Sequence, residues 1–357
     1  MARRFDDPLF LKEKKRHGHF LLTVCLLLLL AVAVSLLVNA FNNRIVRLNE
    51  QSVTMPSMPK AFEKFRILHI SDLHGARFGD GQEAIMTAIK NASYDVVCIS
   101  GDMASANGDF TALTELIEAL PQNVPIYFVA GDEDPDPVLM EAHATNNVKA
   151  EYVLAAEKRG AIYLDAPAQI KTSGGKSIWL CPDAFLSIDL KSTERALTDY
   201  QAELIKKPSD ANTEAALRAV EYRLDTLKRS EEARQKMLSD DLYIVLTHVP
   251  YTENALQNLL DSVAGDQSLA LKRVNLVLAG HYNNGQFRLP FLGAVWLPES
   301  LGAADRGAKL SGLRVIRGVS QYVNPGLGAA KIYTLLPWRF FNPPAVTLIT
   351  LTTALTQ

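Results

Sequence analysis

The sequence lacks an excess of positive charge. Its 357 residues contain 37 Lys and Arg against 39 Asp and Glu, which gives a formal net charge of −2 and a pI near 6.4. Proteins that hold nucleic acid use Lys and Arg to neutralise phosphates. The charge balance therefore argues against a nucleic-acid partner. The chain also shows no internal repeat, and its only low-complexity tract is a leucine-rich run near the N-terminus.

Cysteine is scarce as well. Cys25 lies in the leucine-rich run, Cys98 in an apolar strand-like run and Cys181 at the end of another such run. A free cysteine packs as a small hydrophobic residue, and a chain of this length can bury a core without a disulfide framework. We therefore expect three free thiols.

One long apolar run is present. The segment FLLTVCLLLLLAVAVSLLV, residues 20–38, carries no charge and is about as long as a helix that crosses a hydrocarbon core. We interpret residues 20–39 as an uncleaved transmembrane signal anchor. The small residues Val38-Asn39-Ala40 leave a cleaved signal peptide as the alternative, but the run is longer than the roughly 7–15 apolar residues of such a peptide.

Basic residues flank the apolar run unequally. Only Arg44, Arg47 and Lys60 follow it up to residue 60, whereas it is preceded by Arg3, Arg4, Lys12, Lys14, Lys15 and Arg16. The positive-inside rule then places residues 1–19 in the cytoplasm. We expect a single-pass protein of a bacterial cell membrane, with its N-terminus cytoplasmic and its main domain extracytoplasmic.

Apolar, β-branched runs alternate with helical patterns after a predicted linker over residues 40–64. Residues 81–91 and 110–120 have apolar side chains at helical spacing, and they separate the first three of six strand-like runs, which are 65–71, 95–100, 126–130, 177–181, 242–248 and 275–281. This alternation predicts βαβ units. It favours an α/β domain over residues 65–357, with helices covering its sheet.

A charged segment interrupts this alternation between residues 191 and 240. Two apolar stripes at helical spacing run through it, one of Leu197, Tyr200 and Leu204 and the other of Leu217, Val220, Leu224 and Leu227. The sequence KKPSDAN between them has the Pro and Asx residues of a turn. We predict an inserted helical hairpin with one packed face and a solvated remainder. A lid or a partner-docking element is the alternative.

Ionisable residues follow five of the strand-like runs. They are Asp72 and His74 after the first run, Asp102 after the second, Asp132, Glu133 and Asp134 after the third, His248 after the fifth and His281 after the sixth. Ligands bind at the carboxyl ends of the strands in open α/β sheets. These side chains are therefore expected to meet at one site.

The residue types in this set suit divalent cations. Asp72 and His74 are two residues apart, so in an extended segment they leave the same face, and a carboxylate with an imidazole suits a borderline cation. Converging carboxylates would repel one another unless cations were bound. Taken singly, Asp72 or Asp102 could cap a helix, His248 could be an ordinary core histidine, and Glu133 with Asp134 could form a solvated turn. Together they favour a metal site.

The ordered motifs resemble those of the calcineurin-like metallophosphoesterase superfamily. The motifs are D-x-H at 72–74, G-D at 101–102, G-D-E-D at 131–134, a lone histidine at 248 and G-H-x-N at 280–283. The segments GQFRLPFLG and RFFNPPAVTLITLT resemble its membrane-anchored bacterial branch of YaeI- and YkuE-like proteins. The resemblance runs from about Phe65 to Thr352. It implies a four-layer αββα sandwich, here with the hairpin inserted and the transmembrane helix added.

The resemblance also implies roles for the site residues. One metal would be held by Asp72 and His74, Asp102 would bridge, and the second metal would be held by His248 and His281. Asp102 would therefore set the spacing of the two metals, which makes it a catalytic candidate together with Glu133. Hydrolysis would use a hydroxide that the metals generate from water.

Four positions depart from the family pattern. Asp132 stands where the family has an Asn ligand of the second metal, and Asn283 stands where it has a His ligand of the first. Glu133 replaces a His that assists the leaving group, a task that a protonated carboxyl could perform. Pro325 takes the place of an expected basic residue. Because Asp132 and Asn283 add oxygen donors, we expect two Mn²⁺ or Mg²⁺ ions, with Fe or Zn as alternatives.

Two functions follow from these observations. The first is a membrane-anchored, metal-dependent phosphoesterase that hydrolyses a phosphomonoester or phosphodiester, with a lipid-linked ester preferred because of the anchor and the apolar segment FRLPFLGAVWLP beside the site. The alternative is a catalytically impaired module of the same fold that docks a partner at the cell envelope. The changes at Asp132, Glu133 and Asn283 are what keep this alternative open.

Overall fold

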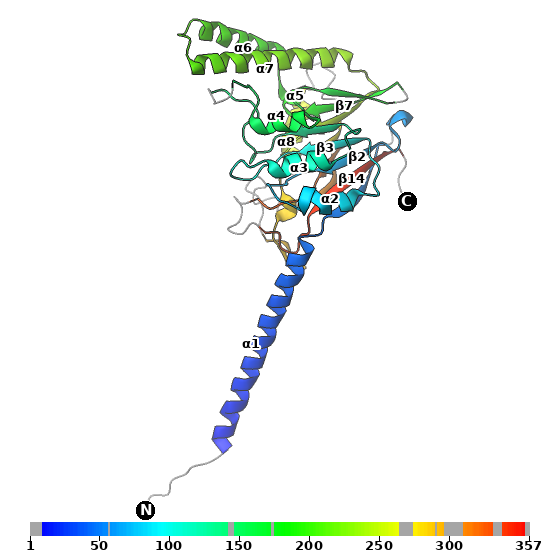
Figure 1. Cartoon of the computed structure of the whole chain (residues 1–357). Helices are drawn as coiled ribbons and strands as arrows, with labels where there is room; N and C mark the ends of the chain where they lie inside the picture. Colours follow the sequence, from blue (N-terminus) through cyan, green and yellow to red (C-terminus); the bar gives the residue numbers. More distant parts are fainter. Residues whose placement is uncertain are drawn as a thin grey trace, which may run out of the picture. The chain divides into compact units, whose positions relative to one another are not determined.

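The chain forms two compact units, Met1–Arg44 and Ile45–Gln357. The computed structural model describes residues 9–55, 58–141, 146–172, 175–263, 274–289, 291–295, 310–330 and 338–353, without the side chains of residues 9–18 and 260–263. Each unit is described by itself below (Figure 1).

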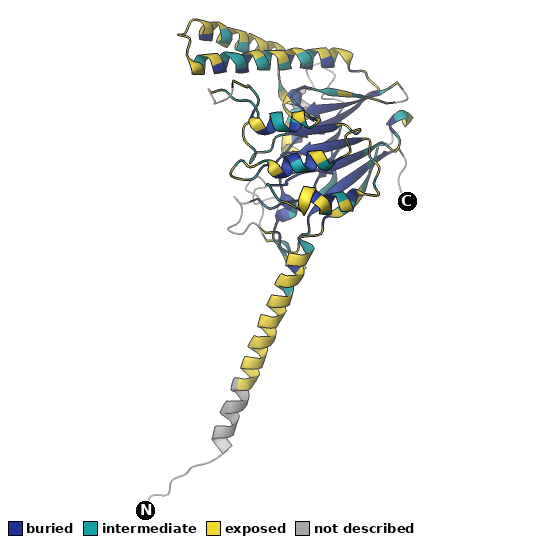
Figure 2. Ribbon diagram, in the orientation of Figure 1, coloured by how far each residue is buried: buried dark blue, intermediate teal, exposed yellow. Residues whose placement is uncertain are grey.

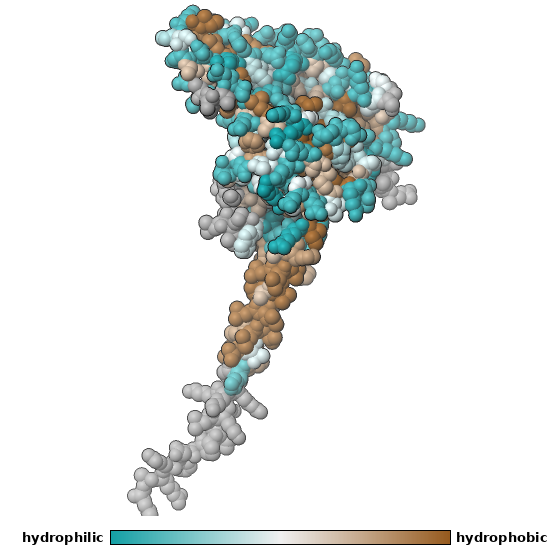
Figure 3. Space-filling view, viewed as in Figure 1, coloured by the Kyte–Doolittle hydropathy of each residue, from teal (hydrophilic) through white to brown (hydrophobic). Residues whose placement is uncertain are grey.

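The first unit is a single helix, α1 (Leu9–Asn42). Its part from His19 to Asn42 is long and apolar enough to cross a membrane, and none of the apolar 18-residue window within that stretch is buried in protein. Figures 2 and 3 show most of this stretch as exposed and strongly hydrophobic. The predicted anchor, residues 20–39, lies within it. Length and composition alone do not distinguish an anchor from a signal sequence.

A six-stranded sheet forms the first half of the second unit. Its strands follow the order β1 (Arg47–Thr54), β14 (Ala345–Thr352), β2 (Arg66–Ile70), β3 (Val96–Ser100), β4 (Ile126–Val129) and β5 (Ala161–Tyr163). Strands β2 to β5 are parallel, and β14 runs antiparallel to β2. The strands predicted at 65–71, 95–100 and 126–130 are therefore confirmed.

A second six-stranded sheet follows the order β12 (Gly312–Ile316), β13 (Val319–Val323), β9 (Val274–Ala279), β8 (Leu242–Leu246), β7 (Ser177–Pro182) and β6 (Ala168–Lys171). Its four central strands are parallel and its two edge strands are antiparallel to their neighbours. A small hairpin pairs β10 (Arg288–Leu289) with β11 (Gly293–Ala294) outside both sheets.

Strand β1 differs from the sequence prediction. Residues 40–64 were expected to form a linker, but β1 pairs in parallel with β14 over eight residues, from Arg47 opposite Ala345 to Thr54 opposite Thr352. A short 3₁₀ helix, η1 (Lys60–Phe62), follows, and Phe62 is buried between the sheets. β1 escaped prediction because its sequence, RLNEQSVT, is polar, as suits an edge strand with solvent on one side.

Alternating side chains divide the core into layers. In β2, Leu68 and Ile70 pack against the outer helices, whereas Ile67 faces the second sheet, as the two-residue period of a strand requires. The helices on that outer face are α2 (Glu83–Ile89), α3 (Thr111–Ala119) and α4 (Glu151–Lys158), with η2 (Asp80–Gln82) leading into α2. They lie in front of the first sheet in Figure 1.

The outer face of the second sheet is covered by α5 (Ala184–Ser187) and α8 (Glu253–Val263). Leu186 of α5 and Leu256 of α8 pack on Val245 and Val277 of the sheet. The order of layers is therefore helix, sheet, sheet, helix, and the predicted four-layer α/β sandwich is confirmed. The thiols Cys98 and Cys181 are buried and free, and Cys25 is exposed and free.

The charged segment after β7 forms the predicted helical hairpin, α6 (Leu190–Ile205) and α7 (Ala211–Lys236). The side chains of Asp189 and Asp210 accept hydrogen bonds from the first backbone N–H groups of α6 and α7, which stabilises each helix start. The two helices pack through Leu197, Leu204, Leu217, Val220 and Leu224. Tyr200, expected in the same stripe, is exposed instead.

The base of the hairpin belongs to the core. Ala233 and Met237, at and just beyond the end of α7, pack with Trp179 and Tyr243 of the second sheet. Since β7 and β8 are parallel, they need a crossover connection, and α5 to α7 provide it. Asp165, which follows β5, also holds α7 through two hydrogen bonds from Arg229, at 2.8 and 2.9 Å.

This contact predicts a pH-dependent contribution to stability. Burial would raise the pKa of the Asp165 carboxyl, but hydrogen bonds from Arg229 and Tyr222 hold it below its ordinary value. A lowered pKa stabilises the fold fully above about pH 4 and loses that effect as the pH falls through the folded-state pKa. Asp165→Asn should therefore reduce the free energy of unfolding at pH 7 by about 1 kcal/mol, because water screens the half-exposed Arg229.

Urea unfolding of the wild type and the variant measures this difference, which should shrink toward zero as both are acidified. Asp225→Asn is the matched control, because Asp225 pairs with the same Arg229 but is 61% exposed. It should cost only a few tenths of a kcal/mol. Equal effects of the two substitutions at pH 7 would contradict the anchoring role of Asp165.

Candidate metal centre

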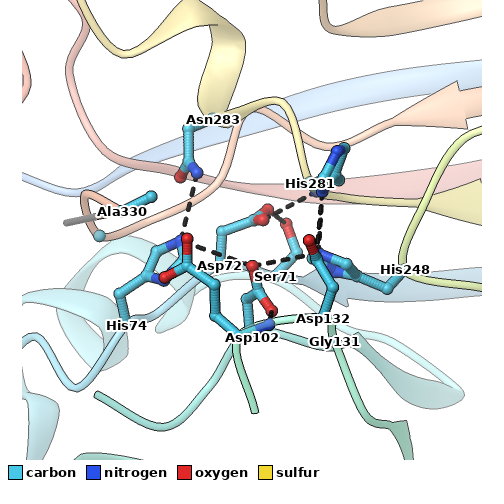
Figure 4. Close-up of polar contacts among 12 residues, drawn as sticks. Ser71, Asp72, His74, Asp102, Gly131, Asp132, His248, His281, Asn283 and Ala330 are labelled. Carbon is cyan, nitrogen blue, oxygen red and sulfur yellow. Dashed lines mark hydrogen bonds and ion pairs between the residues drawn. The ribbon is translucent and has the colours of Figure 1, made fainter. Parts of the chain in front are cut away.

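The strand ends of both sheets meet at one edge of the sandwich. Asp72 and His74 follow β2, Asp102 follows β3, and Asp132 and Glu133 follow β4, while the second sheet contributes His248 after β8 and His281 and Asn283 after β9. Figure 4 shows these predicted residues, apart from Glu133, pointing toward one another. His248 also joins the two sheets, because its Nδ1 lies 2.8 Å from the carbonyl oxygen of Ser100 in β3.

The first group of potential ligands contains Asp72, His74 and Asp102. One ligand atom from each lies within 4.8 Å of the others. The Nε2 atom of His74 is 3.9 Å from Oδ2 of Asp102. The backbone N–H of His281 donates to Oδ1 of Asp72 at 2.8 Å, and the Ser71 hydroxyl donates to its other oxygen. Asp72 is therefore held in place by neighbours from both sheets.

The second group contains Asp102, Asp132, His248 and His281, again with ligand atoms within 4.8 Å of one another. Nε2 of His248 lies 3.1 Å from Asp102 and 2.7 Å from Asp132, and Nδ1 of His281 lies 3.1 Å from Asp132. The Nδ1 atom of His248 faces the Ser100 carbonyl, so Nδ1 would keep its proton when a metal binds and Nε2 would be the atom free to act as the ligand. This backbone contact fixes the tautomer in the way that is usual for metal-bound histidines.

Asp102 belongs to both groups. Its side chain is almost completely buried, its Oδ2 faces both His74 and His248, and its Oδ1 accepts a hydrogen bond from the Glu133 backbone N–H at 2.9 Å. A carboxylate with this position can contact two cations at once. The predicted bridging geometry is therefore compatible with the structure.

Strained backbone brings the side chains together. Five site residues have a positive φ, namely Asp72 (54°), His74 (48°), Asp102 (54°), His281 (75°) and Asn283 (47°). Such a conformation costs an ordinary residue of order 1–3 kcal/mol and persists where the surroundings impose it. Here the loops after β2 and β3 impose it on each other, since Asp72 N–H bonds to Gly101 O and His74 N–H bonds to Asp102 O.

Gly131 is required by the close approach of these loops. A Cβ atom at this position would lie 2.0 Å from Oδ1 of Asp102 and 2.3 Å from its backbone nitrogen. Any other residue would push Asp102 away from the histidines. The glycine that precedes Asp132 in the sequence thus protects the position of the shared carboxylate rather than providing a turn.

The charges in the site are mutually dependent. Burial would lower the pKa of His248, but contacts with Asp102 and Asp132 raise it well above its ordinary value. Burial would raise the pKa of Asp132, but hydrogen bonds with His248 and His281 lower it. Burial raises the pKa of the Asp72 carboxyl. The carboxylates therefore need positive charge next to them. A protonated histidine supplies it, but its protonated nitrogen then has no lone pair with which to bind a metal.

Divalent ions fit this set of side chains. Neither oxygen of the buried Glu133 carboxylate, nor Nδ1 of His74, makes a well-aligned hydrogen bond within the described part of the chain. Carboxylate oxygens and imidazole nitrogens are the donors that Mn²⁺, Mg²⁺, Fe and Zn²⁺ accept. Two cations would neutralise the converging carboxylates and release the protons from the histidines.

The position of Glu133 differs from the predicted role in protonating a leaving group. Its Oε2 lies 3.2 Å from Nδ1 of His74, and both side chains are only 4% exposed. A carboxylate behind a metal-binding imidazole orients the ring and strengthens it as a ligand. The geometry thus places Glu133 behind His74 and away from solvent, where a positioning role suits it better than proton delivery.

Asn283 lies at the site but is held from two sides. Its Nδ2 is 3.2 Å from Nε2 of His74, and its Oδ1 is 3.3 Å from Nη1 of Arg339. Arg339 is buried, and burial lowers its pKa to about 10. It also donates to the carbonyl oxygens of Pro325 and Gly328, both at 2.7 Å. The predicted ligand role of Asn283 stays a prediction, because its amide oxygen faces this guanidinium.

Sequence reasoning missed Arg339 and, although it placed Asp134 at the site, it did not foresee what Asp134 contacts. Arg339 provides a cation beside Pro325, where a basic residue was expected, and Asp134 accepts hydrogen bonds from the backbone N–H groups of Met103, Ala104 and Gly131 at 2.7–2.9 Å. Asp134 therefore ties the β3 and β4 loops together and is not part of a solvated turn. The repeated acids of GDED gave a signal for Asp134, whereas nothing near Arg339 in the sequence links it to residue 283.

A cleft of about 440 Å³ adjoins the loop that carries Asp132. Its walls include Val129 and Ala130 from the end of β4, and Leu197, Tyr222 and Leu227 from the hairpin. The hairpin therefore helps to shape a largely apolar space beside the second group of ligands. Such a space could receive the part of a substrate that lies beyond the reacting group.

These features are those of a candidate metal centre of the phosphoesterase type, and the chain belongs to the calcineurin-like phosphoesterase family, whose sequence pattern matches residues 65–283. The chain is 22% identical over 317 residues to the uncharacterised metallophosphoesterase YkoQ of Bacillus subtilis (strain 168), a match that spans 87% of this chain and 94% of that protein. It is 40% identical over 78 residues to the uncharacterised metallophosphoesterase YkuE of the same organism, which spans 22% of this chain and 24% of YkuE.

Among solved structures, the chain is similar to the phosphopantetheinyl hydrolase PptH from Mycobacterium tuberculosis, with 12% identity and a TM-score of 0.35, over 74% of this chain and 91% of that one. The family assignment rests on the sequence match and not on this likeness.

The position of Glu133 leads to a testable distinction. If Glu133 orients His74, Glu133→Gln should weaken binding of the metal held by Asp72 and His74 by roughly 10–100-fold, without changing how the rate depends on the leaving group. Titration calorimetry with Mn²⁺ measures the first quantity, and a series of aryl phosphate esters measures the second. Asp136→Asn is a control because Asp136 lies in the same loop and is exposed. Unchanged metal affinity with a selective loss on poor leaving groups would restore the general-acid role.

Proposed function

We propose that this protein is a membrane-anchored, metal-dependent phosphoesterase. The observation that carries the proposal is the sharing of Asp102 by two groups of potential ligands. Two-metal phosphoesterases need this geometry, because one ion must act on the attacking oxygen and the other on the phosphoryl group.

We propose the following ligand roles, which the closeness of the side chains supports. Asp72, His74 and Asp102 would hold one ion, and Asp102, Asp132, His248 and His281 the other, with Asn283 as an added oxygen donor to the first. Such ions lower the pKa of a bound water and polarise the phosphoryl oxygens. Ser71, Ser100 and Glu133 hold the side chains of Asp72, His248 and His74 in position, and Asp102 would set the separation of the ions.

Harder ions suit this site better than Zn²⁺. Asp132 brings a carboxylate, and its side chain is 45% exposed, so one side of the second group opens to solvent and substrate. As a proposed ligand, Asn283 would offer an amide oxygen in place of an imidazole nitrogen, with its amide turned from Arg339 toward His74. Because oxygen donors favour Mn²⁺ and Mg²⁺, we propose these as the working ions, with Fe or Zn²⁺ as weaker alternatives.

The substrate is proposed to be a phosphomonoester or phosphodiester carried by a lipid. Support comes from the apolar helix α1 and from the apolar walls of the cleft beside Asp132. With the basic residues on the N-terminal side of α1, the domain would lie on the outer side of the cell membrane. A phosphate ester in that membrane would then be within reach.

The test uses residues 45–357, which contain both sheets and the core clusters that hold them together. The protein should hydrolyse a chromogenic phosphodiester or phosphomonoester when Mn²⁺ or Mg²⁺ is added, and Asp102→Asn should reduce turnover to background because both ions lose a ligand. Asp136→Asn should keep full turnover. A folded wild-type domain that binds these ions but hydrolyses neither ester would contradict the proposal and favour the docking module instead.

A further inference from the structure

An exposed apolar surface lies next to the metal centre. We name it the apolar tip, and it consists of Leu289, Phe291, Leu292 and Val295 of the β10–β11 hairpin together with Trp338 and Phe341. Phe291 is fully exposed, Leu292 is 80% exposed and Val295 is 62% exposed. Exposed apolar side chains that gather in one place mark an interaction surface.

The two segments of the apolar tip lie side by side. The backbone N–H of Arg288 donates to Phe340 O at 2.9 Å, that of Phe340 donates to Gln286 O at 3.0 Å, and the rings of Phe287 and Phe340 stack with centroids 6.3 Å apart. Gln286 is three residues from Asn283. The tip is thus built directly onto the loop that closes the first ligand group.

The conformation of Phe291 indicates that the exposed surface of the apolar tip has a role in binding. Phe291 has a φ of 68°, a left-handed conformation that is unfavourable for a bulky residue and suits Gly, Asn or Asp. Its side chain is fully exposed and contributes nothing to the core. Neither local conformation nor folding therefore explains an aromatic residue at this position, whereas contact with an apolar phase does.

The sheet register places the start of the second unit at the edge of the sandwich that carries the metal centre. Arg47 pairs with Ala345 at the start of β14, which runs antiparallel to β2 with Thr347 opposite His69. The start of β1 therefore lies at the edge where β2 ends and Asp72 begins the site. Arg47 N–H also donates to Pro344 O at 2.9 Å, three residues from Phe341 in the apolar tip.

The covalent chain then limits how far this edge can be from the end of the anchor. Five residue steps separate Asn42, the end of α1, from Arg47, and such a segment spans at most about 18 Å whatever its conformation. Arg47 is exposed and Arg288 is half-buried beside the tip, which places positive charge where anionic headgroups would lie. Tryptophan, here Trp338, is favoured at the same depth.

We infer that the apolar tip rests on the surface of the bilayer that holds α1, so that the metal centre takes its phosphate ester from the headgroup layer. This inference builds on the proposed function and assigns the membrane as the occupant of the tip. Lipid phosphates would approach from the side of β14 and β2, and the cleft under the α6–α7 hairpin lies at the opposite end of the same edge, beside β4 and β5.

The experiment is vesicle flotation of residues 45–357, which lack α1, with vesicles of phosphatidylcholine and phosphatidylglycerol. The wild-type domain should float with the vesicles. Phe291→Asp combined with Leu292→Asp should reduce the bound fraction at least tenfold while leaving thermal stability intact, since Asp tolerates the conformation of residue 291. Ile205→Asp is the matched control, because Ile205 is 68% exposed at the far end of the α6–α7 hairpin, and it should bind as the wild type does.

Activity on a soluble chromogenic ester separates this inference from the proposed function. Wild-type turnover of that ester by the double variant, together with lost hydrolysis of a phosphate ester embedded in vesicles, would support the apolar tip as the membrane contact. Soluble turnover without any vesicle binding by the wild type would overturn the inference and leave the phosphoesterase intact. Equal loss of binding in Ile205→Asp, or wild-type self-association that the double variant abolishes in place of vesicle binding, would also overturn it.

Discussion

The burial of one shared carboxylate governs this structure. Asp102 lies between two histidine-containing groups at the junction of two sheets, and its position depends on Gly131, the β4 loop and His248. A buried carboxylate without a cation is costly, so the surrounding side chains are organised to provide one. Despite their burial, His74 and His248 have a pKa that is raised by their acidic neighbours, and with bound metals the two rings would be ligands. The strained loops are tolerated because both sheets hold them.

The topology of the fold gives the site different surroundings on its two sides. Parallel strands end at the same edge of each sheet, so the two sheets together bring five chain segments to one place. One end of this edge carries β1 and the apolar tip, and the other carries the cleft under the α6–α7 hairpin. A substrate with an apolar part and a polar part can therefore lie across the metal centre with each part in a matching environment.

Much of this architecture could be predicted because it follows simple patterns. Buried parallel strands are apolar runs, and ligands follow their carboxyl ends, so the positions of Asp72, Asp102 and His281 were readable from sequence. Strand β1 was not predictable in this way, because an edge strand needs only alternating burial and the sequence of β1 is polar. The orientation of Glu133 depends on the path of a loop, and the contact between Arg339 and Asn283 joins residues 56 positions apart. Contacts of this kind leave no local signal.

The central claim is that Asp102 joins two metal ions, and the magnetic coupling between the ions tests it most directly. Metal-free protein titrated with Mn²⁺ should bind two ions per chain, and its electron paramagnetic resonance spectrum at low temperature should show the multiline pattern of an exchange-coupled pair, because two-metal sites hold their ions about 3.5–4 Å apart. A single Mn²⁺ per chain, or two ions with only the six-line spectrum of isolated Mn²⁺, would contradict the account.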